Sequence, residues 1–143
     1  MSVKQISVFL ENRPGALCEM TRVLGDNNID MRAFSLAETS DFGIARIIVD
    51  DVYATTTVLK DAGYINSVTS VLALSIPNVP GGLSGVLAAL GKAKINVEYI
   101  YAFVGAERDT ACLIMKVADE AKAVQVLRET GVKMIEQEDL SKI

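Results

Sequence analysis

A six-residue stretch that occurs twice constrains this chain more than any other feature of its sequence. Residues 12–17 read Asn-Arg-Pro-Gly-Ala-Leu, and residues 78–83 read Asn-Val-Pro-Gly-Gly-Leu, 66 positions later. Each copy follows an apolar run typical of a strand and precedes apolar residues with the period of a helix. Because proline fixes φ and glycine reaches backbone conformations that other residues resist, each copy predicts a strand-to-helix turn.

The similarity extends beyond the two turns. At the offset of 66, the same residue types recur at positions spread over most of the first half: Asn12, Pro14, Gly15, Leu17, Leu24, Gly25, Ile29, Ala45 and Ile48. Self-similarity of this kind indicates a duplicated structural unit. Further along, Gly63 corresponds to Gly131 at an offset of 68. We therefore expect two extra residues in the loop, or at the helix start, before the last helix.

Apolar periodicity predicts the same six elements in each half, with the last strand of the first half and the first strand of the second both drawn from residues 64–77. The first half should hold strands at 3–10, 29–37 and 44–49 and helices starting near residues 16 and 52. The second should hold strands at 95–104, 110–117 and from 132, a turn at 107–109, and helices starting near 83 and 119. The order βαββαβ is the ferredoxin-like plan, an antiparallel four-stranded sheet with both helices on one face. The sequence thus predicts an α+β chain of two tandem ferredoxin-like units, residues 1–70 and 71–143.

The junction between the halves is unusually apolar. Residues 64–76 contain no glycine, no proline and no charged residue, so there is hardly a linker. One arrangement is a long strand that bends from one sheet into the next, and the other is an exchange of edge strands. Both predict halves that are held rigidly together.

Composition excludes several classes of function. The 143 residues carry a net charge of −4 with scattered lysine and arginine, which argues against a nucleic-acid partner. No stretch approaches the length of a membrane span and no secretory signal begins the chain, so we expect a cytoplasmic protein without a membrane partner. There is no histidine, and Cys18 and Cys112 do not make a zinc site. We expect no metal and no cofactor, and two buried or half-buried free thiols.

The turns themselves leave two interpretations open. The first N–H groups of a helix are unpaired and suit a small anion, and an asparagine can bind either charged end of an amino acid. Alternatively, the proline and glycine only make the turn, and Asn12 and Asn78 cap the helices. Taken alone, the turn-only interpretation is favoured. The glycines at 81, 82 and 85 do not make a nucleotide loop, because the spacing and residue types of such loops are missing.

A resemblance to a known protein family favours ligand binding at the turns over turn formation alone. Asn-x-Pro-Gly-x-Leu after a strand, then an apolar helix, then Gly-x-Asn-Asn-Ile-Asp at 25–30 or Gly-x-Ala-Lys-Ile-Asn at 91–96, resembles the ACT domain. This regulatory module binds amino acids in biosynthetic enzymes such as phosphoglycerate dehydrogenase and aspartokinase. The resemblance covers nearly the whole chain as two copies and leaves no catalytic domain. It implies side-by-side pairing of the copies and effector sites where the turn of one copy faces its neighbour.

The resemblance also implies which residues bind the ligand. In dehydrogenase-like members, an asparagine in the turn and another at the start of the second strand hold the amino acid. Asn12 and Asn78 match the first, and Asn96 matches the second, where the first half has Asp30. The two sites are therefore not expected to be equivalent. The expected ligand-binding residues are Asn12, Arg13, Pro14, Gly15, Ala16, Leu17, Asp30 and Met31 in the first half, and Asn78, Val79, Pro80, Gly81, Gly82, Leu83, Asn96 and Val97 in the second.

The function that these observations favour is effector binding without catalysis. The expected partners are a free amino acid, an amino-acid biosynthetic enzyme regulated in trans, and a second copy of the chain as a homodimer. One alternative is an interaction module that needs no ligand. Another is a small ferredoxin-like enzyme, which the lack of histidine and of a placed nucleophile disfavours.

Overall fold

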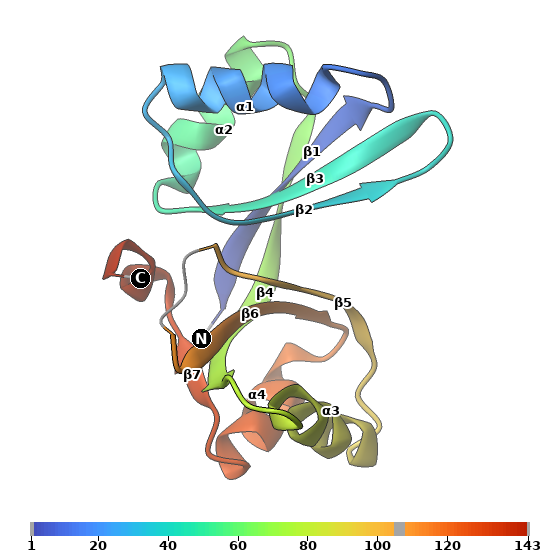
Figure 1. Cartoon of the computed structure of the whole chain (residues 1–143), viewed down its shortest axis with the longest axis vertical. Helices are drawn as coiled ribbons and strands as arrows, with labels where there is room; N and C mark the ends of the chain where they lie inside the picture. Colours follow the sequence, from blue (N-terminus) through green and yellow to red (C-terminus); the bar gives the residue numbers. More distant parts are fainter. Residues whose placement is uncertain (1, 105–107, 143) are drawn as a thin grey trace. The chain divides into compact units, whose positions relative to one another are not determined.

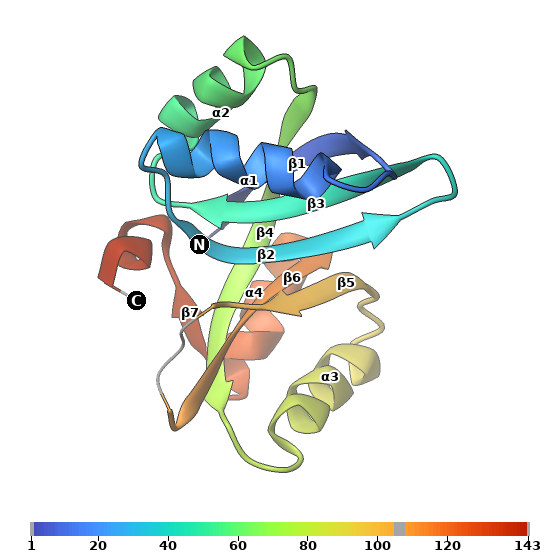
Figure 2. The ribbon, with the colours of Figure 1, turned by 45° about the horizontal axis from the view of Figure 1, so that its top comes forward.

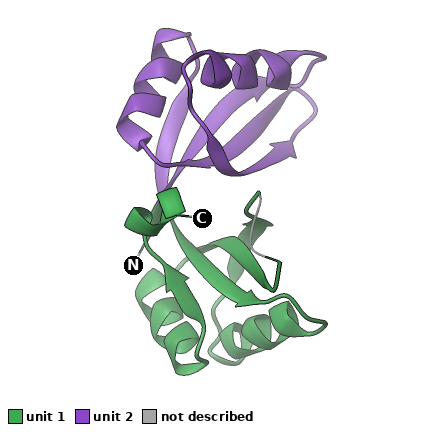
Figure 3. Ribbon diagram, turned by 60° about the vertical axis from the view of Figure 1, so that its left-hand side comes forward, with its two compact units in different colours: residues 1–3, 70–143 green, residues 4–69 purple. Residues whose placement is uncertain are grey.

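The structure, a computed structural model, describes residues 2–104 and 108–142. It divides into two compact units, shown in different colours in Figure 3. The N-terminal unit comprises residues 4–69, and the C-terminal unit comprises residues 70–143 with residues 1–3. No helix in the described ranges is long and apolar enough to cross a membrane.

The N-terminal unit contains β1 (Val3–Glu11) except for its first residue, α1 (Ala16–Asp26), β2 (Met31–Glu38), β3 (Phe42–Val49), α2 (Val52–Asp61) and the beginning of β4 (Asn66–Pro77). Its strand order is β2-β3-β1-β4, and β3 pairs antiparallel with both β1 and β2. Both helices lie on the same face of this sheet (Figures 1 and 2).

The C-terminal unit repeats this plan with the rest of β4, α3 (Gly82–Lys92), β5 (Val97–Ala102), β6 (Thr110–Val117), α4 (Glu120–Glu129) and β7 (Lys133–Ile135). The strand order is β7-β4-β6-β5, and all three pairings are antiparallel. The predicted pair of ferredoxin-like βαββαβ units is thus confirmed. A short 3₁₀ helix, η1 (Gln137–Lys142), follows β7 where the sequence suggested only a polar tail, and its Leu140 is fully buried.

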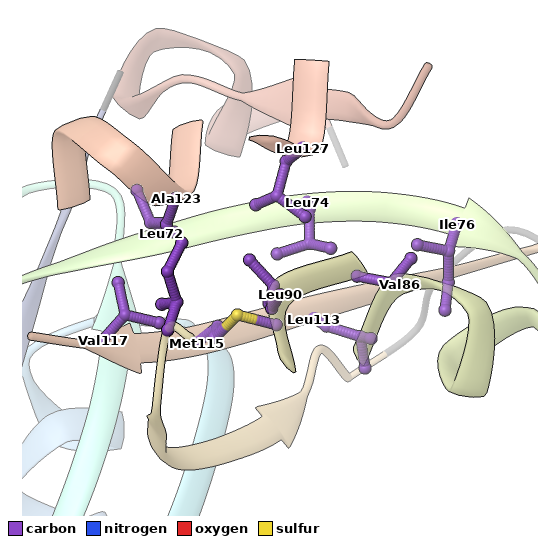
Figure 4. Packing of buried hydrophobic residues seen from close by; sticks show 11 residues of the cluster. Leu72, Leu74, Ile76, Val86, Leu90, Leu113, Met115, Val117, Ala123 and Leu127 are labelled. Atoms are coloured by element: carbon purple, nitrogen blue, oxygen red, sulfur yellow. The ribbon is translucent and has the colours of Figure 1, made fainter. Parts of the chain in front are cut away.

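Alternating apolar residues of the strands build the core of each unit. In the C-terminal unit, Leu72, Leu74 and Ile76 of β4 face the helices and pack with Leu90 and Leu127 (Figure 4). In the N-terminal unit the matching core contains Ile6, Val8 and Leu10 of β1 together with Met20, Leu24, Ala45, Ile47, Val49 and Leu59. Side chains of period 2 on the strands and period 3.6 on the helices thus meet on one side of each sheet.

The four helices begin in two different ways. Asp51 and Asp119 cap α2 and α4, because their carboxylates accept hydrogen bonds from the backbone N–H of Ala54 and Lys122 at 3.0 and 3.1 Å. The helices α1 and α3 have no side-chain cap. Their N-cap residues are Gly15 and Gly81, with φ of 84° and 83°. The notion that Asn12 and Asn78 cap these helices is therefore wrong.

Strand pairing corrects where the extra residues of the second half lie. Leu36 pairs with Ala45, and Ala102 pairs with Leu113, so the offset is already 68 when β6 begins. The extra residues consequently lie in the hairpin between β5 and β6, not before the last helix. Of the turn expected at 107–109, Glu107 lies outside the described residues.

The two thiols differ in their surroundings. Both cysteines are free, as expected, and Cys112 is buried on β6. Cys18 is exposed on α1, which contradicts the expectation that both thiols are at least half-buried.

Candidate functional site

Each turn is fastened to the neighbouring hairpin by its asparagine. The Asn12 backbone N–H donates to the Asp41 carbonyl oxygen at 3.1 Å, and its side-chain Nδ2 donates to the Thr39 carbonyl oxygen at 2.8 Å. Asn78 makes the same pair of contacts, to Asp109 at 3.0 Å and to Arg108 at 3.4 Å. One N–H of each asparagine side chain is therefore used within the fold. Its Oδ1 atom is the end that can accept a hydrogen bond from a ligand.

The first turn of α1 leaves backbone donors open. Ala16 donates to the Arg13 carbonyl at 3.3 Å, and Glu19 donates to the Gly15 carbonyl at 2.9 Å. Within the described chain, the N–H groups of Gly15, Leu17 and Cys18 donate to no backbone or side-chain acceptor. Open N–H groups at the positive end of a helix dipole attract a carboxylate.

Arg13 is occupied by two carboxylates of its own chain. Its Nε lies 2.9 Å from Glu11 Oε2, and its Nη2 lies 3.0 Å from Glu19 Oε2. The hydrogen bond from Arg13 lowers the pKa of Glu19, and the same contact raises the pKa of Arg13. The guanidinium therefore adds no uncompensated positive charge to the turn. The second half has Val79 at this position.

Two hollows lie beside the turn of the N-terminal unit. The smaller has a volume of about 60 Å³ and is lined by Leu10, Glu11, Asn12, Arg13, Ala16, Leu17, Leu36, Glu38 and Gly43. The larger, which we name the α1–β2 groove, has a volume of about 480 Å³ and is lined by Leu17, Cys18, Met20, Thr21, Met31, Phe34, Ser35, Leu36, Ala45 and Ile47. Leu17 and Leu36 line both, so the groove continues from the turn along α1 and the edge strand β2.

The structure brings together only part of the predicted site. In the first half, Asn12, Arg13, Ala16 and Leu17 meet at the small hollow, and Leu17 and Met31 meet in the groove. Asp30 follows the C-terminal end of α1, whereas Asn12 precedes its N-terminal end. The 11 residues of the helix span about 16 Å, so one unit cannot place both side chains on one amino acid.

Asp30 lies near an ion pair formed by Arg32 and Asp50. Arg32 donates from Nε and Nη2 to the Asp50 carboxylate at 3.0 and 2.8 Å, and its Nη1 lies 3.6 Å from Asp30 Oδ2. Asp30 itself is exposed. In the second half, Glu98 stands at the position of Arg32 and pairs with Lys116 at 3.8 Å. The starts of β2 and β5 therefore differ in charge at two positions. Asp30 corresponds to Asn96, and Arg32 corresponds to Glu98.

The turn of the C-terminal unit is largely exposed. Asn78, Val79, Pro80 and Gly81 are exposed, Gly82 is half-buried, and Leu83 is exposed on the first turn of α3. Asn96 is exposed and Val97 is half-buried after the far end of α3. A Cβ at Gly82 would lie 2.5 Å from the Pro77 carbonyl oxygen, so glycine is required there, whereas the first half has Ala16.

Sequence reasoning missed most of the groove. Phe34 and Leu36 alternate on β2 and face the helices, since they pair with the core residues Ile47 and Ala45. This alternation of apolar residues was the sequence signal that could have revealed the groove. In the second half, Tyr99 and Tyr101 of β5 lie on the face of the sheet opposite the helices, with ring centroids 6.4 Å apart.

The chain's family follows from the comparison of its sequence with known families. The family model of the ACT domain pair matches residues 1–143. The chain belongs to the ACT domain pair family.

In the described ranges, no cluster of three or more histidine, cysteine or acidic side chains could hold a metal ion. No protein of curated function matches the chain.

Solved structures similar to this ACT domain pair agree with that assignment. Protein BT0572 from Bacteroides thetaiotaomicron has 39% identity and a TM-score of 0.92, and the match covers 100% of this chain and 98% of that one. The ligand-free regulatory subunit of aspartate kinase from Thermus thermophilus has 14% identity and a TM-score of 0.66, with 88% and 91% covered. The corresponding subunit from Thermus flavus has 16% identity and a TM-score of 0.63, with 88% and 90% covered. At that identity, the two kinase subunits establish a shared fold.

Proposed function

We propose that this ACT domain pair is a regulatory protein that binds a free amino acid and catalyses no reaction of its own. The observation that carries the proposal is the turn of the N-terminal unit. It presents open N–H groups and the Asn12 Oδ1 atom beside a groove large enough for a small molecule. A volume of about 480 Å³ falls within the range of roughly 300–1,000 Å³ of small-molecule sites.

The two charged ends of an amino acid have complementary partners at this turn. The N–H groups of Gly15, Leu17 and Cys18 would bind the carboxylate. The Asn12 Oδ1 atom would accept a hydrogen bond from the ammonium group, and Glu38 on the wall of the small hollow adds a negative charge. Since Arg13 is already paired with Glu11 and Glu19, the turn favours a zwitterion over an anion.

Asp30 and Asn96, which lie just before the second strand of each half, have a different role in the proposal. Because α1 separates Asn12 from Asp30, and α3 separates Asn78 from Asn96, a ligand held by both kinds of residue would have to bridge two copies. Binding would then bias the arrangement of the copies, which is how a ligand regulates. In this proposal the second copy comes from a homodimer of the chain.

The regulated partner in this proposal is an amino-acid biosynthetic enzyme acted on in trans. Two solved structures with this fold are regulatory subunits of aspartate kinase. The match of the ACT domain pair model to residues 1–143 supports a regulatory role of this kind.

A thermal-shift screen of the twenty amino acids tests the proposal. Ligand at a hundredfold excess over Kd should add about 2.7 kcal/mol to the free energy of unfolding. Asn12→Ala should abolish the shift if the first half binds, and Asn78→Ala should abolish it if the second half does. Asn27→Ala is the matched control, because Asn27 also donates from Nδ2 to a backbone carbonyl, that of Val23 at 2.8 Å, but lies at the far end of α1.

Two outcomes would contradict the proposal. If no amino acid raises the melting temperature, an interaction module without a ligand is favoured instead. The exposed side chains of Phe9, Phe42 and Ile65, which line one hollow on the N-terminal unit, would then be its first candidate surface. If Asn27→Ala weakens the response as much as Asn12→Ala, the turn is not the site.

A further inference from the structure

The α1–β2 groove has a wall without charge. Its large side chains are those of Leu17, Met20, Met31, Phe34, Leu36 and Ile47, and no acidic or basic residue in the described part of the chain lines it. The hydroxyl group of Thr21, one of its few polar groups, donates to the Cys18 carbonyl oxygen at 3.0 Å. A charged group placed there would lose its hydration without gaining a counterion, which is costly.

Apolar surface is left uncovered along the groove. Phe34 is 52% exposed, Leu36 is 50% exposed and Leu17 is 37% exposed, although all three lie beside a well-packed core. Single exposed apolar residues are ordinary, but three that line one hollow beside a turn with open polar groups form a continuous amphipathic site. The polar end of that site is the small hollow at Asn12, and the apolar end is the groove.

We propose that the amino acid bound at the Asn12 turn has an uncharged, apolar side chain, and that this side chain lies in the α1–β2 groove. The inference rests on the proposed function and adds the chemical class of the ligand. With the carboxylate on the N–H groups of the turn, the side chain passes between Leu17 and Leu36, the two residues that line both hollows.

The second half is built differently at the matching positions. On β5, Ile100 pairs with Met115 and Ala102 pairs with Leu113, as Phe34 pairs with Ile47 and Leu36 with Ala45. Ile100 and Ala102 replace the two large exposed side chains of the first half. The apolar specificity therefore belongs to the first half.

Pairs of ligands with matched shape separate this proposal from amino-acid binding in general. The pairs are valine and threonine, leucine and asparagine, and norleucine and lysine, with affinities measured by titration calorimetry. The apolar member of each pair should bind at least about tenfold more tightly, and each added methylene from alanine upward should tighten binding about fourfold, equivalent to ~0.8 kcal/mol.

Cys18 supplies a direct test of where the side chain lies. It is exposed and lines the groove, whereas Cys112 is buried, so a thiol reagent such as Ellman's reagent should label Cys18 first. Saturating leucine should slow that labelling at least tenfold, and asparagine at the same concentration should not.

Phe34→Glu and Phe42→Glu form the matched variants. Both replace a half-exposed phenylalanine in the N-terminal unit, but only Phe34 lines the groove. Phe34→Glu should weaken the binding of the apolar amino acid at least tenfold, and Phe42→Glu should leave it unchanged. Circular dichroism of both variants checks that each one folds.

The alternative results are distinct. Binding of a charged or polar amino acid in preference to its apolar match would leave the proposed function standing and overturn this inference. Apolar binding without protection of Cys18 would overturn it too. If no amino acid binds and Phe34→Glu converts a dimer into a monomer in light scattering, the groove is an interface between copies, and both proposals fail.

Discussion

Arg32 shows how one side chain ties the start of a strand to the end of its neighbour. The residue lies at an irregularity of β2 between Met31 and Ala33, where the register against β3 shifts. Its guanidinium donates two hydrogen bonds to Asp50, just after β3. A two-pronged contact of this kind fixes orientation better than a single one. The pair thereby holds the irregular start of β2, next to Asp30, in place.

Removing this pair should cost a modest and pH-dependent amount of stability. The hydrogen bond from Arg32 lowers the pKa of Asp50 below its usual value of 3.8. A lowered folded-state pKa adds stability that is fully present above the usual pKa and is lost as the pH falls through the folded-state pKa. Asp50→Asn should therefore lower the free energy of unfolding by about 0.5–1 kcal/mol at pH 7, the range for pairs that remain partly exposed.

Urea unfolding of the wild type and Asp50→Asn at several pH values measures this difference. The difference should stay constant above about pH 5 and shrink as the pH falls below the usual carboxyl pKa, because a protonated Asp50 resembles asparagine. A double-mutant cycle with Arg32→Gln isolates the pair. A difference that grows in acid would contradict the assignment.

The asparagines of the turns mark the limit of prediction at the residue scale. Asn12 and Asn78 could be singled out from the repeat, because identical residues at equivalent positions have equivalent surroundings. Their contacts could not be predicted, since Thr39 and Arg108 approach them only after the hairpins have folded. Sequence propensity suggested a helix cap, which is a local contact, and the tertiary contact prevailed instead.

Helix starts divide the four helices into two kinds at the scale of elements. Asp51 and Asp119 cap α2 and α4, and these two helices have no predicted ligand site. Gly15 and Gly81 open α1 and α3 in the left-handed conformation, without a side-chain cap. The helices at the proposed sites are thus the ones whose first N–H groups are not satisfied by a side chain.

The two kinds of helix start should respond differently to substitution. Asp51→Ala removes the hydrogen bond to the Ala54 N–H and should lower the free energy of unfolding by about 1 kcal/mol, as for other helix caps. Asp119→Ala should do the same in the second unit, since its bond to Lys122 is equivalent. Neither should change amino-acid binding. Chemical denaturation gives the stability, calorimetry gives the binding, and a loss of binding in Asp51→Ala would place the site at α2 instead.

Strands were predicted where alternation was clean and less well where hairpins interrupt it. The third strand was expected at 44–49, but β3 begins at Phe42, since the hairpin closes through Thr39 and Phe42. The strand expected at 95–104 is shorter at both ends, because β5 runs from Val97 to Ala102. The geometry of the turns, rather than apolar periodicity, determines where these strands begin and end. The pattern of apolar residues does not predict that geometry.

The whole molecule depends on one strand that belongs to both units. β4 runs without interruption from Asn66 to Pro77, and its residues up to Thr69 belong to the N-terminal unit. It serves as the fourth strand of the first ferredoxin-like unit and the first strand of the second. The apolar segment 64–76 indicated such a shared element, although the sequence left strand exchange open. Whether 1–70 and 71–143 act as separate folding domains stays a prediction.

A strand shared in this way predicts that the two halves unfold together. Leu127 and Leu59 are fully buried at equivalent positions of α4 and α2, and Leu127 packs with Leu74 of β4 in the C-terminal core (Figure 4). Leu127→Ala and Leu59→Ala should each lower the free energy of unfolding by about 2–5 kcal/mol, the cost of a cavity in a packed core. Because loss of either core releases β4, each substitution should also speed hydrogen exchange in the core strands of the other half. Exchange followed by mass spectrometry reads the halves separately, and faster exchange confined to the substituted half would mean that they fold as independent domains.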